Sequence, residues 1–145
     1  MFSKACEYAI RSVIYITLSS QKSPKVSLKD IAREIDSPEA FTAKILQQLV
    51  RSKLVESQKG PSGGFWITEQ LSKEIRLSQI VKAIDGEKVY QGCGLGLKEC
   101  SEKQPCPIHG KFKFVRNALR EMLETTSLYE LAHGLKDGAV LRLHN

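Results

Sequence analysis

The sequence contains no long apolar run and no recognisable secretion signal. Its Leu, Ile and Val residues are spread over the whole length, in runs far shorter than the ~20 residues that a membrane-spanning helix needs. The first residues, MFSKACEYAI, lead into amphipathic periodicity without a long apolar core or a small-residue cleavage site. We therefore expect a soluble, cytoplasmic protein that does not enter a membrane.

Motifs of the common enzyme classes are missing as well. No oxyanion-forming signature accompanies the Cys and His residues, and motifs that bind nucleotide phosphates are absent. The 145 residues, 41% hydrophobic and 26% charged, suffice for one well-packed domain with an appended segment. The formal net charge of +6 is compatible with an anionic partner. We expect a binding protein and not an enzyme.

The first third of the sequence predicts helices. Apolar residues at helical spacing indicate a helix over 3–19, and Ser27 is placed to cap a short helix that follows it. The segment 36–38 predicts a turn, with Ser37 as the cap of a second helix and Pro38 at its first position. This second helix, EAFTAKILQQLVRS, buries apolar residues and is expected to expose three polar side chains, which are those of Thr42, Lys44 and Gln47.

A β-hairpin is predicted next, because the extended runs 54–59 and 64–68 flank the turn sequence GPSG. Two helices joined by a tight turn and followed by a hairpin are typical of a winged helix-turn-helix, whose second helix fits a DNA major groove about 12 Å wide. Residues 22 to 59 include eight Lys and Arg and five Asp and Glu. Because this excess of positive charge is small, we expect that a dimer is needed to contact enough phosphates for tight binding. The predicted DNA-binding residues are Ser27, Ser37, Thr42, Lys44, Gln47, Lys59, Gly60, Pro61 and Ser62.

The remaining sequence predicts a helix over 75–86, a long helix over 111–124 and a short helix over 127–132. The long helix carries a narrow apolar seam at 3-4-3 spacing, formed by Phe112, Val115, Leu119 and Met122. A narrow seam indicates a partner helix, and we expect a homodimer. The fold class is thus mostly α with a small β-hairpin. The predicted segments are a winged helix-turn-helix DNA-binding domain (1–86), a cysteine-rich loop (87–110), a dimerisation helix with a short following helix (111–133) and a flexible tail (134–145).

Three of the four cysteines are crowded into CGLGLKECSEKQPCPIH, a stretch rich in Gly and Pro that spans residues 93–109. In a reducing cytoplasm such clusters more often bind metal or sense redox state than form disulfides. Thiolates favour iron-sulfur clusters, zinc or copper. A zinc site of the Cys3His type, a thiol-disulfide switch and a loop without any ligand are the alternatives. Cys6 differs, because it lies on the apolar face of the first helix and is expected to be buried.

These features together resemble one family, the IscR and NsrR family of regulators (the Rrf2 family). The resemblance rests on EYAIR at 7–11, the helix-turn-helix at 27–50, KGPSGGFWI at 59–67, LSQIVKAIDG at 77–86 and the three cysteines before a long helix. It implies a homodimeric winged-helix transcription factor whose long helix carries dimerisation and whose loop holds a 2Fe-2S cluster. Lys59 and Ser62 in the wing, where relatives often have Arg and Gly, and Ala43 in the second helix, where some have Glu, depart from the family pattern. Operator preference therefore does not carry over.

Four ligands are needed for such a cluster, and His can replace Cys among them. Cys93, Cys100 and Cys106 supply three, and His109 resembles the histidine ligand of the IscR branch. The alternative fourth ligand is Glu7 of the partner subunit, at the position where some NsrR-like relatives offer a carboxylate.

The expected function is a transcriptional regulator, in the first place a repressor, that binds an operator in double-stranded DNA and senses redox state, nitric oxide or iron-sulfur status. A zinc-stabilised or thiol-switch regulator and a non-DNA-binding adaptor remain the alternatives.

Overall fold

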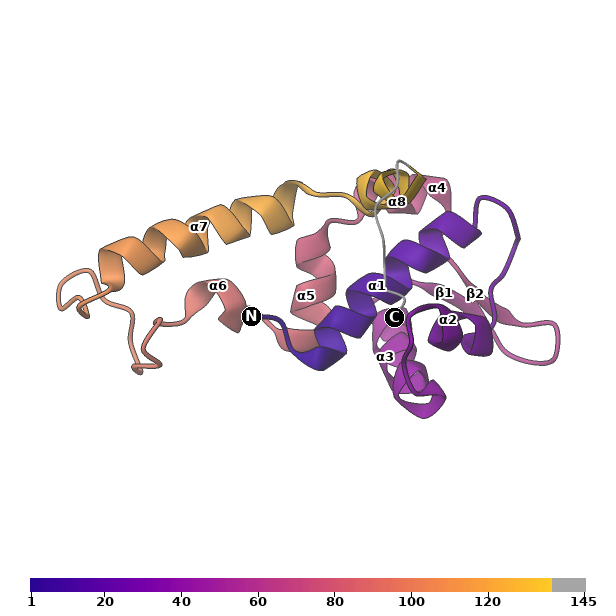
Figure 1. Ribbon diagram of the computed structural model, residues 1–145, viewed down its shortest axis with the longest axis horizontal. Helices are drawn as coiled ribbons and strands as arrows, with labels where there is room; N and C mark the ends of the chain where they lie inside the picture. Colours follow the sequence, from indigo (N-terminus) through magenta and orange to yellow (C-terminus); the bar gives the residue numbers. More distant parts are fainter. Residues whose placement is uncertain (137–145) are drawn as a thin grey trace.

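The structure, a computed structural model, describes residues 1–136 and consists of a body with a protruding arm (Figure 1). The body contains the helices α1 to α5, the hairpin and α8, and the arm contains α6, α7 and the cysteine loop, residues 92–108. None of the helices within residues 1–136 is long and apolar enough to cross a membrane. In chain order the elements are α1 (Lys4–Ser19), α2 (Leu28–Glu34), α3 (Glu39–Arg51), β1 (Glu56–Gln58), β2 (Gly64–Trp66), α4 (Glu69–Glu74), α5 (Leu77–Asp85), α6 (Lys88–Gln91), α7 (His109–Thr125) and α8 (Leu128–Lys136).

Helix α1 forms the centre of the body, and α2, α3, α5 and α8 all pack against it. Its start is fixed by Ser3, whose hydroxyl accepts a hydrogen bond from the backbone N–H of Cys6 at 3.0 Å. One face of α1 is fully buried in the main core, through Ala9, Val13 and Ile16. The predicted winged helix-turn-helix is confirmed, because α2, α3 and the hairpin follow one another on this core.

The hairpin pairs β1 with β2 in antiparallel register, with Ser57 opposite Phe65. Two glycines make its tip possible. Gly60 has a φ of 102°, which side-chain-bearing residues rarely adopt, and a Cβ on Gly63 would lie 2.0 Å from the carbonyl oxygen of Gln58. The tip therefore depends on glycine at both positions, as its sequence predicted.

Helix α8 returns to the body after the arm. The backbone N–H of Leu77 donates to the carbonyl of Thr126 at 2.9 Å, and the N–H of Leu128 donates to that of Ile75 at 3.2 Å. Leu128 and Ala132 are completely buried. The dimerisation helix and the short following helix predicted within 111–133 thus lie in the arm and in the body, respectively, and 134–136, predicted as tail, are helical. The rest of the predicted tail lies outside the described residues.

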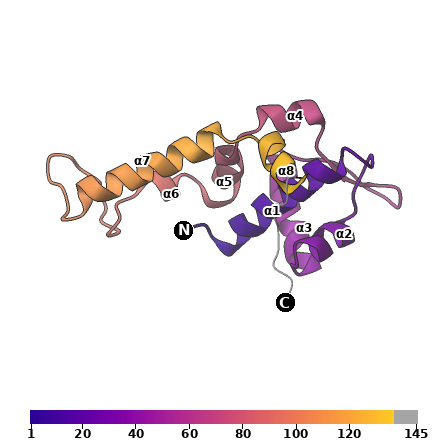
Figure 2. The ribbon, with the colours of Figure 1, turned by 45° about the horizontal axis from the view of Figure 1, so that its top comes forward.

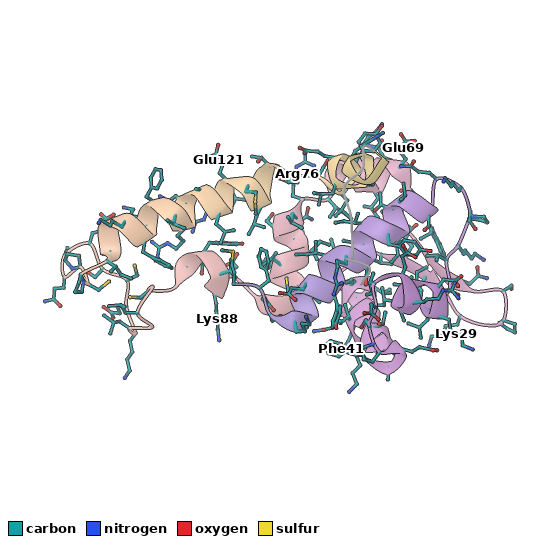
Figure 3. All side chains as sticks on the ribbon, viewed as in Figure 1. Lys29, Phe41, Glu69, Arg76, Lys88 and Glu121 are labelled. Atoms are coloured by element: carbon teal, nitrogen blue, oxygen red, sulfur yellow. The ribbon has the colours of Figure 1, made fainter. Side chains whose placement is uncertain are left out.

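The arm is joined to the body by a second, smaller core. Leu123 of α7 and Tyr90 of α6 pack there with Cys6, Leu77 and Val81. Two views agree that α6 lies alongside α7 and that the cysteine loop is at the far end of the arm (Figures 1 and 2). Lys88 and Glu121 project from opposite sides of the arm (Figure 3).

Candidate functional site

A groove between α3 and the hairpin brings together residues that were predicted to bind DNA. Gln47 lines it from α3, and Lys59 and Gly60 line it from the hairpin. Arg51 lines the same groove one helical turn after Gln47, and sequence reasoning missed it although its spacing places it on the same helix face. Lys44 is exposed on α3 outside this groove. The groove thus combines hydrogen-bonding and cationic side chains.

Thr42 does not offer a polar group to DNA, contrary to the sequence prediction. Its side chain is fully buried, and its hydroxyl lies 3.0 Å from the Ser37 hydroxyl and donates to the carbonyl oxygen of Pro38 at 2.9 Å. The prediction failed because a short polar side chain can satisfy its hydrogen bonds on the preceding turn. Helix α3 begins at Glu39 with Pro38 at the cap position, so Ser37 is not its N-cap.

The other predicted DNA-contacting residues lie at exposed positions. Ser27 caps α2 by accepting from the N–H of Asp30 at 3.1 Å. Pro61 and Ser62 form the hairpin tip. The Lys25 ammonium donates to the Ser62 carbonyl at 3.2 Å and also to the Gln58 side chain, so Lys25 braces the tip from outside the hairpin.

The four predicted metal ligands occur in two pairs. The sulfur atoms of Cys93 and Cys106 lie 3.9 Å apart, and the Cys100 sulfur lies 3.4 Å from Nδ1 of His109. His109 is the first residue of α7, and its N–H donates to the carbonyl of Cys106 at 3.0 Å. Within residues 1–136, no three His, Cys, Asp or Glu side chains gather around one possible metal position.

The separation within each pair matches two ligands of one tetrahedral metal ion. With metal–sulfur distances of about 2.3 Å and metal–nitrogen distances of about 2.0 Å, two sulfurs lie about 3.8 Å apart, and a sulfur and a nitrogen about 3.5 Å. Nε2 of His109 and Nε of Arg116 are buried and have no hydrogen-bond partner among the described residues. Buried polar atoms without partners are rare, and here both lie beside the candidate ligands. The donor set is therefore one that soft metal ions accept, and each pair has the spacing of two ligands on one ion.

Several contacts hold the cysteine loop against α7. Glu102 forms an ion pair with Lys113, and this contact lowers the pKa of the Glu102 carboxyl. A Cβ on Gly94 would lie 2.8 Å from the Phe112 ring, so only glycine fits there. The N–H of Leu95 donates to the Cys93 sulfur at 3.4 Å, and hydrogen bonds from Leu95 and its neighbours lower the pKa of the Cys93 thiol.

Cys6 and Glu7 are adjacent in α1 but have different environments. Cys6 is fully buried, as predicted, and burial together with nearby Asp85 raises the pKa of its thiol to about 12. The carboxylate of Glu7 is exposed and lies 3.4 Å from the Lys4 ammonium. Cys6 is therefore a core residue, and the role of Glu7 as a ligand from the partner subunit stays a prediction.

The predicted apolar seam of α7 divides into two parts. Phe112 and Leu119 are half-buried against their own chain, and Leu119 packs on the smaller core. Val115 and Met122 are exposed, with 54% and 46% of their surface accessible. Phe114, which the seam did not include, is 77% exposed. The apolar surface available to a partner helix is therefore centred on Phe114, Val115 and Met122.

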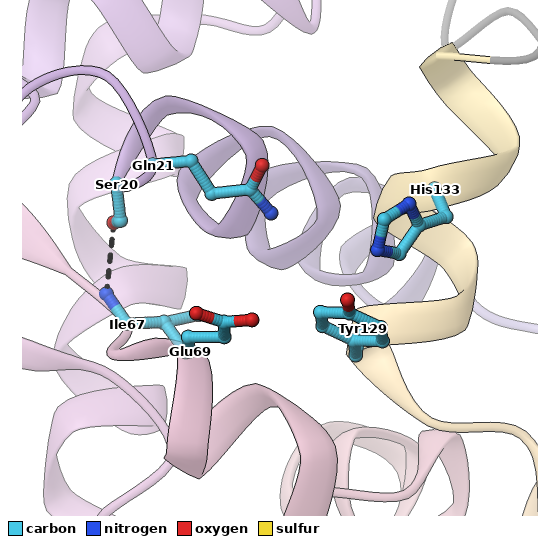
Figure 4. Close-up of a pocket in the computed structure, with 6 residues that line it drawn as sticks. All are labelled: Ser20, Gln21, Ile67, Glu69, Tyr129 and His133. Carbon is cyan, nitrogen blue, oxygen red and sulfur yellow. Dashed lines mark hydrogen bonds between the residues drawn. The ribbon is translucent and has the colours of Figure 1, made fainter.

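A separate pocket lies in the body, between the end of α1, the start of α4 and α8 (Figure 4). Polar side chains dominate its walls, and the Ser20 hydroxyl accepts from the N–H of Ile67 at 3.1 Å, which ties α1 to the end of the hairpin. None of the predicted DNA-binding or metal-binding residues lines it. The lining residues are Ser20, Gln21, Ile67, Glu69, Tyr129 and His133.

Comparison with known proteins gives consistent results over most of the chain. The model of the Rrf2 family, described as iron-dependent transcriptional regulators, matches residues 2–134. A candidate helix-turn-helix transcriptional regulator of Aquifex aeolicus is 29% identical over 133 residues, or 90% of each chain. The transcriptional regulator IscR of Vibrio atlanticus is 27% identical, covering 94% of this chain and 75% of its own. In fold, the chain is similar to CymR, the global cysteine regulator of B. subtilis, with a TM-score of 0.75, 22% identity, and coverage of 92% of this chain and 97% of CymR.

Proposed function

Because this chain belongs to the Rrf2 family of transcriptional regulators, we propose that it is a DNA-binding repressor controlled by a 2Fe-2S cluster. The ligands in this proposal are Cys93, Cys100, Cys106 and His109, with Glu7 of the partner subunit as the alternative to His109. When bound, the cluster supplies a one-electron redox couple and a cross-link that is lost with it. Redox state, nitric oxide and iron-sulfur supply are the candidate signals.

The pairing of the ligands is the observation that carries this proposal. A 2Fe-2S cluster needs two protein ligands on each iron, and the loop presents Cys93 with Cys106 and Cys100 with His109. A single zinc ion would need all four side chains around one centre. The two close pairs suit this arrangement, with one pair on each iron.

DNA binding is assigned to α3 and the hairpin. Lys44 and Gln47 are exposed on α3, and Lys59 to Ser62 are exposed at the hairpin tip. In this proposal, α3 reads base edges in the major groove while Lys59 contacts a phosphate. The apolar residues Phe114, Val115 and Met122 pair two copies into a homodimer, so that the two operator halves are related by a twofold axis.

The cysteine loop can influence α3 through a continuous series of packed helices. Loop residues contact α7, α7 packs on α5, and α5 packs on both α1 and α3. Ligation affects DNA affinity only if the two states of the loop differ in their contacts with α7. We expect a change of roughly 5- to 150-fold in operator affinity, as is typical for coupling between sites.

The decisive experiment is a metal analysis of protein purified without oxygen. We expect visible absorbance and about equal amounts of iron and sulfide, two of each per chain. Cys100→Ala should remove both and change operator affinity, whereas Cys6→Ala, the matched control, should keep the colour. Stoichiometric zinc without iron or sulfide, in protein that stays colourless after reconstitution, would replace the cluster with the zinc alternative.

A further inference from the structure

Arg116 reaches from α7 into the cysteine loop and touches one candidate ligand directly. Its Nη1 donates to the carbonyl oxygen of Gly92 at 2.8 Å and to the sulfur of Cys100 at 3.2 Å. The guanidinium also lies over the Phe112 ring, 6.0 Å from its centre. Arg116 thus links the start of the loop, the middle of the loop and the long helix through one side chain.

We propose that Arg116 is a positioning residue for the proposed cluster, holding Cys100 in place and raising the reduction potential of the site. This inference rests on the function proposed above. Hydrogen bonds to ligating sulfurs and nearby positive charge are among the factors that set cluster potentials. Reduction adds one electron without breaking a bond, and the extra negative charge is stabilised by the adjacent guanidinium. The Nε of Arg116 is buried and has no partner among the described residues, so its N–H is a donor that the protein leaves unused.

Arg120 offers a matched control, because it lies one helical turn later on the same face of α7. Its Nη2 donates to the carbonyl oxygen of Tyr90 at 2.9 Å, and its guanidinium lies 5.1 Å from the centre of the Tyr90 ring. Arg120 therefore fixes α6 in the same manner in which Arg116 fixes the loop, but its described contacts involve no candidate ligand. Removing either charge changes the net charge of the arm equally.

The test compares Arg116→Gln, Arg116→Lys and Arg120→Gln in the full-length chain, reconstituted with iron and sulfide without oxygen. Dithionite is the electron donor, and visible absorbance reports the oxidised fraction at each potential. For Arg116→Gln we expect the oxidised-to-reduced ratio at a fixed potential to rise at least threefold over the unsubstituted protein, a shift of about −28 mV for one electron. Arg116→Lys should recover part of this shift, and Arg120→Gln should show none.

The outcomes separate this inference from the function on which it rests. If the unsubstituted protein takes up no iron and sulfide, the cluster proposal fails, and the role of Arg116 fails with it. If the cluster forms and Arg116→Gln has the potential of Arg120→Gln, the role of Arg116 alone is refuted. If Arg116→Gln loses the cluster while Arg120→Gln keeps it, the positioning role is supported, and the potential is then decided by Arg116→Lys.

Discussion

Replacement of Lys59 by Ala tests the assignment of the hairpin as a DNA-binding wing. Lys59 is exposed directly after β1 and before Gly60, whose positive φ turns the chain into the tip. A lysine at this point can approach the DNA backbone without obstruction by its own fold. We therefore expect Lys59→Ala to weaken binding to many sequences and to flatten the dependence of binding on salt.

The size of the effect follows from the number of wings. Each neutralised phosphate contributes about 0.9 to the slope of the logarithm of the binding constant against the logarithm of salt concentration. A twofold dimer carries two copies of Lys59, so the slope should fall by about 1.8. Over a fourfold change in salt, from about 50 to about 200 mM, the affinity ratio of unsubstituted protein to variant should then change about 12-fold.

The assay is a titration of labelled operator DNA, followed by fluorescence anisotropy at several salt concentrations. Lys98→Ala is the control, because it removes the same charge from an exposed position in the cysteine loop. A slope change of about 0.9 would indicate that only one wing contacts DNA. Equal slopes for Lys59→Ala and the unsubstituted protein would refute the wing assignment.

Two further predictions concern the dimer and the core. Val115→Asp should give monomers in sedimentation velocity and weaken operator binding, because it puts a charge in the exposed apolar face of α7. A dimeric Val115→Asp variant would contradict the dimer face. Because the folded state raises the pKa of Cys6 to about 12, it keeps a proton that the unfolded chain releases near pH 8.5 to 9. Ionisation of Cys6 should therefore leave the free energy of unfolding in urea unchanged below this range and lower it between pH 9 and 12. The same decline in a Cys6→Ala variant would show that another group is responsible.

The sequence predicted elements with strong periodicity well and short or irregular elements poorly. Helix α1 and the hairpin were predicted because the apolar spacing and the glycine turn are local signals. Helices α4 and α6 have only six and four residues, too few to show a period. Thr42 was misplaced because its polarity was given more weight than its spacing. It lies at the i position of the i, i+3, i+4, i+7 pattern that Ile45, Leu46 and Leu49 complete, and its hydroxyl bonds to the preceding turn.

In the cysteine loop, the sequence identified the candidate ligands but not their arrangement. The spacing of Cys93, Cys100 and Cys106 is compatible with any pairing, because a glycine-rich loop can follow many paths. Contacts with α7 select one path, through the ring of Phe112 beneath Gly94 and through Arg116. Arg116 itself carries no local signal, since an arginine in an amphipathic helix is usually a solvated surface residue.

The return of α8 to the body has a consequence for how this protein is made. Leu128 belongs to the core around α1, and α8 packs on α1, yet α8 is synthesised after the whole arm. A nascent chain that has left the ribosome as far as α5 still exposes the apolar surface of α1 that α8 covers, so the DNA-binding unit cannot reach its final packing at that stage. The loop that holds the candidate ligands thus leaves the ribosome before the core is closed. In the proposed function, the metal ligands therefore leave the ribosome before the DNA-binding unit has its complete core, and a chain cut off before α8 would lack part of that core.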